Sequence, residues 1–307
     1  MSTLHSAAAR LNQDIYADGN LVAGDANGAV IGFIASVFDH DGRPGLSRFL
    51  PLERDRLWSW RDRRGELQGA MITRTWRLID GLAGINLGYV CVRPELRRLG
   101  VGSSLVRSVV TQEEDEGAAF AMCWARDHLV DFYRSMGFAD LGTEAYCELT
   151  PLNDVREGMA VDVQDLGALS HAGIDAVRRE RAGAVLRGFD HGVWKGINPG
   201  FPWAPDLKVV YAGKVTQPAW YAVVGEAGGT VTMVEFSGRP EQFDGAVGTI
   251  RHRFGSARVR VNLTDPRMAQ MATASRGPEI GVPFHRLLRS SLIDRAAAPI
   301  TTWLDRI

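Results

Sequence analysis

Three strand-like runs of alternating polar and hydrophobic positions lie in the first part of the chain, and a helical run follows them directly. The strand-like runs are residues 56–62, 66–79 and 84–92, with turns at Arg64-Gly65 and Asp80-Gly81 between them. Short connections of this kind predict an antiparallel meander. Pro94 has no amide hydrogen to give to a ladder, so the third strand is expected to end there.

Helical and strand-like segments then alternate up to residue 150. After the meander, the hydrophobic positions with helical spacing are Leu105, Val106, Val109 and Val110. The pattern next predicts a strand at 118–125, a short helix at 127–138 and a strand at 143–150. Before the meander, helical spacing predicts a helix over residues 30–38, with Asp25 as its N-cap.

The second half of the chain repeats this order. Its predicted elements are a helix at 162–189, a hairpin of 219–224 with 230–236, a helix at 240–254, a strand at 257–263 and a helix at 265–275. The repetition predicts an α+β protein of two domains, each a mostly antiparallel twisted sheet flanked by helices. Loop-like composition at 151–158 puts the boundary there, which gives domains of residues 1–150 and 151–307.

Composition and charge narrow the choice of partners. The 307 residues are 45% hydrophobic and 23% charged, typical of a soluble globular protein. The net charge of -1 provides no general field for nucleic acid or an anionic membrane, so neither is expected as a partner. The three cysteines form no CxxC pair, and the N-terminal residues lack the apolar core of a secretory signal. A cytoplasmic protein is expected.

A glycine-containing turn precedes the helix after the meander. Gly100 and Gly102 let the backbone approach a ligand closely, and a helix start offers unpaired amides to an anion such as a pyrophosphate. Arg97 and Arg98 add cationic donors beside it. A Walker loop is excluded because no Lys follows Gly102, and Leu105 occupies the third glycine position of a Rossmann fingerprint. The alternative is a tight surface turn with two solvated arginines.

The sequence around this turn resembles the GNAT superfamily of acyl-CoA-dependent N-acyltransferases. VRPELRRLGVGSSL, residues 92–105, supplies the Arg-x-x-Gly-x-Gly signature after a strand that ends in Val-x-Pro. A second signature, an aromatic-Tyr pair before a Gly-Phe strand start, appears as Phe132-Tyr133 and Gly137-Phe138. The resemblance covers residues 20–150, and the order of elements makes the whole chain similar to tandem GNAT proteins with a degenerate second domain.

The resemblance implies a site for acetyl-CoA as co-substrate. The strand at 84–92 would part from the strand at 118–125, and the pantetheine arm would lie between them. Main-chain groups of Val90, Cys91 and Val92 would hold that arm and the thioester carbonyl. The pyrophosphate contacts would come from Arg97, Arg98, Leu99, Gly100, Val101, Gly102, Ser103 and Ser104. One departure from the family is Arg126, where many members have Asn.

The resemblance also gives Tyr133 the role of the acid that protonates the leaving thiolate, with simple core packing as the alternative. The general base is missing, because residues 84–92 carry no carboxylate and only Asn86 and Tyr89 as polar candidates. A water relay or the C-terminal carboxylate would have to replace it. Cys91 and Cys123 are expected to be buried rather than nucleophilic. The scattered histidines predict no metal site.

The function expected from these features is N-acetyl transfer from acetyl-CoA to a primary amine of a small molecule or peptide, in a ternary complex. The second domain lacks the glycine turn and has Glu241 at the corresponding junction, so it is expected to wall the acceptor site rather than to bind CoA. Its aromatic loop at 194–203 could stack on an acceptor or pack between the domains. A catalytically weak CoA-binding regulator or scaffold is the alternative, and a homodimer stays open. Transfer of aminoacyl groups from tRNA is disfavoured by the neutral charge.

Overall fold

The computed structural model of the chain describes residues 19–23, 28–38, 55–77, 81–149, 161–165, 207–214, 217–256, 258–263 and 266–290. Its N-terminal elements are β1 (Asn20–Ala23), α2 (Gly28–Phe38), β2 (Asp55–Arg61), β3 (Leu67–Arg77), β4 (Ala83–Val92), η3 (Pro94–Leu96), α3 (Val101–Asp115), β5 (Ala121–Ala125), η4 (Asp127–Leu129), α4 (Val130–Arg134) and β6 (Ala139–Leu149). Its C-terminal elements are β7 (Val161–Asp165), β8 (Leu207–Lys214), β9 (Gln217–Ala227), β10 (Thr230–Ser237), η5 (Pro240–Gln242), α7 (Phe243–Phe254), β11 (Arg258–Asn262), α8 (Pro266–Met271), η6 (Ala272–Ser275) and β12 (Arg276–Arg289).

The twelve described strands form one continuous sheet in the order β1-β2-β3-β4-β5-β12-β6-β11-β10-β9-β8-β7. Each half contains an antiparallel meander, and in each half the last meander strand pairs in parallel with the strand after the following helix. The halves exchange their final strands. β12 pairs with β5 of the first half, and β6 pairs with β11 of the second.

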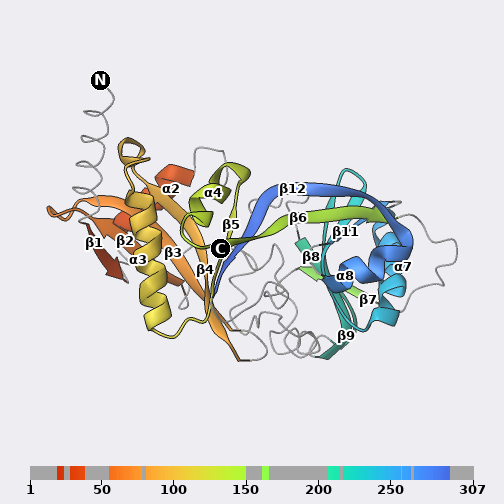
Figure 1. Ribbon diagram of the computed structural model, residues 1–307. Helices are drawn as coiled ribbons and strands as arrows, with labels where there is room; N and C mark the ends of the chain where they lie inside the picture. Colours follow the sequence, from red (N-terminus) through yellow and green to blue (C-terminus); the bar gives the residue numbers. More distant parts are fainter. Residues whose placement is uncertain are drawn as a thin grey trace, which may run out of the picture.

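The long strands β6 and β12 belong to both halves, as Figure 1 shows where they cross the middle of the molecule. Counted with this shared pair, β1 to β5 form one mixed sheet of seven strands and β7 to β11 form another. The β6–β12 pairing is irregular between Gly281 and His285, where Pro283 lies. This break marks the passage from one half to the other, since proline cannot donate to a ladder.

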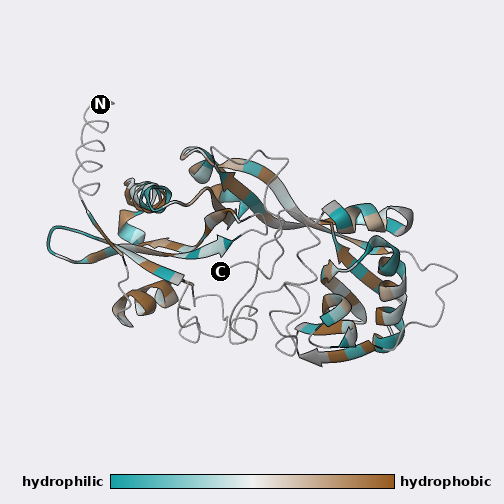
Figure 2. Ribbon diagram, turned by 90° about the horizontal axis from the view of Figure 1, so that it is seen from below, coloured by the Kyte–Doolittle hydropathy of each residue, from teal (hydrophilic) through white to brown (hydrophobic). Residues whose placement is uncertain are grey.

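Helices cover both faces of the first half. α3 and α4 pack on one face over a core that includes Trp58, Leu105 and Val109. The hydrophobic helix α2 packs on the other face over Ala70 and Ile72, and Figure 2 shows α2 and α3 on opposite sides of the strands. In the second half α7 and α8 cover a core that contains Trp220, Phe236 and Phe243, among other buried side chains.

The predicted α+β architecture with two GNAT-like units is confirmed, and so are the meander, the helix over 30–38, the hairpin of the second half and its two helices. The predicted helix at 162–189 is wrong at its start. Residues 161–165 form β7, because Val161 and Val163 alternate with polar residues and pack on the second core. The predictions for Asp25, for the loop at 151–158, for residues 166–189 and for the aromatic loop at 194–203 lie outside the described residues.

Strands β1, β8 and β12 are absent from the sequence prediction. β12 contains Gly277, Pro278 and Pro283, which argue against a strand, and the ladder with β6 shifts register around them. The division into residues 1–150 and 151–307 stays a prediction. β12 shows in addition that the C-terminal half supplies a strand to the N-terminal sheet.

Candidate functional site

Strands β4 and β5 run in parallel at the centre of the first half, but they pair at three positions only. The pairs are Ile85 with Ala121, Asn86 with Met122 and Leu87 with Cys123. Beyond Leu87, β4 continues to Val92 and has β3 as its sole partner among the described strands, while β5 continues to Ala125 beside β12. The two strands therefore separate toward α4, as Figure 1 shows. Residues 88–92 and 124–125 are called the β4–β5 split below.

A bulge in β4 begins where the split begins. From Gly88 to Cys91 the strand advances three residues while its partner β3 advances two, from Ile72 to Ala70. The extra residue re-aims the side chains beyond it. Val90 and Val92 pack against the α3–α4 core, whereas Cys91 and Tyr89 lie on the α2 face.

A four-residue turn, residues 97–100, connects the η3 turn to helix α3. Gly100 is the N-cap of α3 and has left-handed backbone angles, with φ 86°. The first helical hydrogen bond is donated by Ser104 N to Gly100 O, at 2.9 Å. The amides of Gly100, Val101, Gly102 and Ser103 thus precede the helical ladder and point out of the helix start. Together with the helix dipole, these amides suit a phosphate group.

Two residues near the split have unusual backbone angles. Tyr89 and Arg98, with φ 51° and 66°, are the non-glycine residues with positive φ in the described part of the chain. A left-handed conformation costs an L-residue about 1–2 kcal/mol. Such strain tends to gather at functional sites, and here it marks the bulge of the split and the turn before α3.

The two arginines of the turn are available to a ligand. Arg97 and Arg98 are exposed, and neither has an ion-pair partner among the described residues. Gly102 faces the split from the first turn of α3. A Cβ atom at this position would stand 3.4 Å from Val92 Cγ2 and 3.6 Å from Phe132 Cζ. The start of α3, the end of β4 and helix α4 therefore come together at this point.

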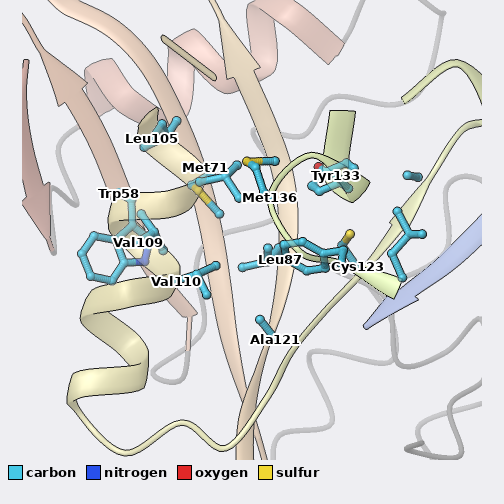
Figure 3. Packing of buried hydrophobic residues seen from close by; sticks show 14 of the residues in the cluster. Trp58, Met71, Leu87, Leu105, Val109, Val110, Ala121, Cys123, Tyr133 and Met136 are labelled. Carbon is cyan, nitrogen blue, oxygen red and sulfur yellow. The ribbon is translucent and has the colours of Figure 1, made fainter. Parts of the chain in front are cut away.

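Tyr133 lies on α4, buried against Phe132 and Phe138, whose ring centroids are 5.0 and 5.5 Å from its own. Figure 3 shows it close to Cys123 of β5. Burial raises the pKa of the phenol well above its ordinary value of 10, and the nearby Cys123 adds to this effect. The hydroxyl group is consequently protonated at neutral pH.

The cysteines lack the character of nucleophiles. Burial raises the pKa of the Cys91 thiol to about 12, against a smaller opposing effect of the Ala70 carbonyl contact and of Arg97. Burial also raises the pKa of Cys123 and of Cys147. A thiol with a raised pKa carries little thiolate at neutral pH, so none of the three is activated.

Two further positions bear on the chemistry. Arg126, at the end of β5, is exposed and holds its guanidinium 5.9 Å from the centre of the Phe284 ring of β12. β4 carries no carboxylate, and its polar residue Asn86 is buried. Within the described ranges, no group of three or more His, Cys, Asp or Glu residues is arranged to hold a metal ion.

The corresponding junction of the second half has a different surface. There α7 follows η5 with no residue between them. Arg239 N donates to the side chain of Gln242 at 2.8 Å, so the start of η5 is capped by a residue of its own turn. A Cβ atom at Gly238 would stand 2.6 Å from Trp220 Cβ, which leaves no room for a ligand beside it.

Comparison with known proteins agrees with the geometry of the first half. The model of the acetyltransferase (GNAT) domain matches residues 53–140, which span the meander, the split, the 97–100 turn and α4. This part of the chain is similar to a GNAT domain. The predicted site residues of this domain, from Val90 to Ser104 and Tyr133, lie around one split, and their roles stay predictions. His285 and Arg289 of β12 reach the same region and were not found from the sequence.

Solved structures share the fold of both halves. A probable N-acyltransferase of Enterococcus faecalis V583 has a TM-score of 0.63 at 14% identity, over 90% of this chain and 74% of its own. A GCN5-related N-acetyltransferase of Anabaena variabilis has a TM-score of 0.62 at 12% identity, over 88% and 73%. Eis1 of Mycobacterium abscessus has a TM-score of 0.59 at 19% identity, over 88% and 73%. The GNAT fold thus extends to a tandem arrangement in this chain.

No curated protein matches the chain in sequence. Among the helices that the structure describes, none is both long and apolar enough to span a membrane.

Proposed function

We propose that the chain is an N-acetyltransferase that transfers the acetyl group of acetyl-CoA to a primary amine of a small molecule or peptide. The observation that carries the proposal is the β4–β5 split, which opens beside a helix start with free amides. The diphosphate of CoA would bind the amides of residues 100–103 together with Arg97 and Arg98. The pantetheine arm would lie in the split along Val90, Cys91 and Val92.

The reaction is a direct transfer. The neutral amine attacks the thioester carbonyl carbon, and a backbone amide of the split near Cys91 and Val92 stabilises the oxyanion. The C–S bond then breaks, and the thiolate takes the proton of the Tyr133 hydroxyl. The amine loses its proton to water, because β4 provides no carboxylate base. The second half walls the acceptor site, and the free cysteines suit a cytoplasmic protein.

CoA binding tests the cofactor part of the proposal. Gly102→Asp puts a carboxylate where the diphosphate would bind and fills the space beside Val92 and Phe132. Calorimetry should show the affinity for acetyl-CoA lowered by at least about 100-fold, the loss of roughly 3 kcal/mol of charged hydrogen bonds. Gly245→Asp, in the first turns of α7 where the added Cβ meets no atom within 4 Å, is the matched control. Unchanged affinity in Gly102→Asp contradicts the proposal.

Turnover tests the role of Tyr133. Tyr133→Phe removes the acid but keeps the ring and its packing on Phe132 and Phe138. Loss of general acid catalysis should lower kcat by about 100-fold with little effect on CoA affinity. The assay uses a panel of aminoglycosides, polyamines, amino acids and peptides. An unaffected rate removes Tyr133 from the mechanism.

A CoA-binding regulator or scaffold is the second candidate, favoured by the absence of a carboxylate on β4. It would bind acetyl-CoA with the same dependence on Gly102 but release no free thiol with any amine of the panel.

A further inference from the structure

The helix that carries Tyr133 is too short to hold its own position. α4 has 5 residues, preceded by the 3-residue η4 turn. Isolated helices shorter than about 12 residues are marginal in water, so a segment of this length is placed by the groups around it. In Figure 1 the segment lies above β5, beside β6 and the end of β12. The contacts that fix it come in part from the opposite end of the chain.

His285 of β12 connects the start of this segment to the strand after it. Its Nδ1 lies 3.0 and 3.1 Å from the two carboxylate oxygens of Asp140 on β6. Because a carboxylate can only accept, Nδ1 is the donor. On the other side of the ring, Nε2 lies 3.4 Å from Asp127 Oδ1, in the first residue of η4. The imidazole ring thus lies between two carboxylates: it donates to Asp140 from Nδ1, and it pairs with Asp127 through Nε2 when the ring is doubly protonated.

Asp140 connects in turn to the end of the segment. Its Oδ2 accepts from Arg134, the last residue of α4, at 2.9 Å, and its Oδ1 accepts from Gly142 N at 2.8 Å. These bonds, including that from His285, lower the pKa of Asp140 against the opposing effect of its burial. Asp140 is therefore ionised at neutral pH. Both ends of the segment, at Asp127 and Arg134, lead to the same His285–Asp140 pair.

Arg289, four residues further along β12, binds just beyond the helix. Its guanidinium donates to Met136 O at 3.3 Å and to Glu114 of α3 at 3.0 Å. Tyr133 lies in sequence between Asp127, which His285 contacts, and Met136, which Arg289 contacts. β12 therefore supplies two contacts to residues 127–138, which are called the Tyr133 segment below. The pairing of Leu287 with Cys123 fixes β12 beside β5.

We propose that His285 is a positioning residue for the transfer reaction: through Asp127 and Asp140 it holds the Tyr133 segment at the β4–β5 split. The inference rests on the proposed function, in which Tyr133 is the acid. It assigns to the second half a contribution to turnover that is separate from any contact with the acceptor. In this proposal His285 acts through the two carboxylates and takes no part in the chemical step.

A double-mutant cycle on turnover tests the inference. His285→Leu keeps the bulk of the ring and removes both polar contacts, and kcat should fall about 10-fold while CoA affinity changes less than about 2-fold. In the Tyr133→Phe background the same change should have no further effect on kcat. His285→Asn can still donate to Asp140 and should recover most of the rate. Arg276→Ala, which removes an exposed ion pair with Glu279 at the other end of β12, is the control and should leave kcat unchanged.

Hydrogen exchange separates this inference from the proposed function. Amides of residues 127–138 should exchange faster in His285→Leu than in the wild type or in Arg276→Ala, whether or not an acceptor has been found. Faster exchange in a protein that transfers no acyl group would retain the positioning of the segment and remove the transferase proposal. Unchanged exchange, or equal losses of kcat in the wild-type and Tyr133→Phe backgrounds, overturns the inference.

Discussion

Helices α3 and α7 begin at corresponding places in the two halves, yet the connections that lead into them differ. Each helix follows the last strand of a meander, and each strand bulges directly after its last parallel pair, at Gly88 in β4 and at Val234 in β10. Each strand is followed by Arg-Pro-Glu, at residues 93–95 and 239–241, and by a short 3-10 turn. The strand, the bulge and the 3-10 turn that surround the candidate site are therefore present in both halves.

The connection between the 3-10 turn and the helix is four residues longer in the first half than in the second. Residues 97–100 separate η3 from α3, whereas α7 follows η5 directly. These four residues include both arginines and the left-handed glycine that turns the amides outward. In the second half β10 and β11 are also bridged beyond their last ladder pair, Met233 with Val261, because Asn262 Nδ2 donates to Val234 O at 3.1 Å. These four residues thus distinguish the helix start that we propose for the diphosphate from its counterpart in the second half.

The space beside the helix start differs as well. Val92, before the first Arg-Pro-Glu, is partly exposed next to Gly102. The second half has Gly238 in its place, with Trp220, Phe236 and Phe243 packed around it. Large aromatic side chains fill a core rather than line a ligand site when they are buried to this degree. In the second half this position therefore contributes to stability.

Removing one of these aromatic side chains gives the largest effect that separates the two halves. Phe243→Ala should lower the free energy of unfolding by about 3–5 kcal/mol, because Phe243 is buried at 1% exposure and its ring contacts Phe236. Urea titration measures the loss. The affinity for acetyl-CoA, measured where the variant is folded, should not change. A large loss of CoA affinity would mean that the second half shares the cofactor site.

Reversing the charge of one arginine at each junction gives the next effect. Arg98→Glu should weaken acetyl-CoA binding by about 2 kcal/mol, roughly 30-fold, because a charged hydrogen bond to phosphate is lost. Arg239→Glu, at the junction of the second half, should have no effect on binding. Calorimetry on both variants compares the two junctions directly. Equal losses would contradict the assignment of the cofactor to the first half.

Much of the fold could be predicted because its hydrophobic periods are local. The meander and helices α3 and α7 follow from residues that are close in sequence, such as Leu105, Val106 and Val109. β12 could not be predicted, since Pro278 and Pro283 contradict the strand signal and its partners β5 and β6 lie more than a hundred residues earlier. The sequence predicts the start of a helix at β7 because five residues are too few to show a strand period clearly.

The candidate site also has a part that local sequence predicts and a part that depends on tertiary contacts. The turn proposed to bind the anion is encoded in consecutive residues, 97–104, so a sequence pattern alone can predict it. The split itself depends on where the β4–β5 pairing stops, which follows from the bulge at Gly88 and Tyr89 and has no motif of its own in this sequence. The contacts of His285 with Asp140 and of Arg289 with Met136 are wholly tertiary, with separations of 145 and 153 residues. No local pattern carries that information.

The smallest predicted effect concerns how pH acts on the two helices. The buried face of α7 has no ionisable residue, whereas that of α3 includes Glu113. Burial raises the pKa of Glu113, although Thr73 Oγ1 donates to it at 2.8 Å and Arg56 lies 3.8 Å away. A carboxyl with a raised pKa in the folded state binds more protons there than in the unfolded chain. The free energy of unfolding should therefore fall as pH rises above about 4.3, the pKa of a Glu carboxyl in the unfolded chain.

Glu113→Gln keeps an acceptor for Thr73 and removes the titration. Its free energy of unfolding relative to wild type should rise between about pH 4 and pH 7, measured by urea titration. For Glu116→Gln the free energy of unfolding relative to wild type should instead fall as pH rises. The hydrogen bond from Arg56 lowers the pKa of Glu116, so the stabilisation by this bond in the wild type is lost as pH falls. Because both residues lie at the end of α3 and share Arg56, a common change in the helix cannot produce opposite slopes. Parallel slopes would show that the two carboxylates titrate as one exposed pair, and that the α3 face is no more sensitive to pH than the α7 face.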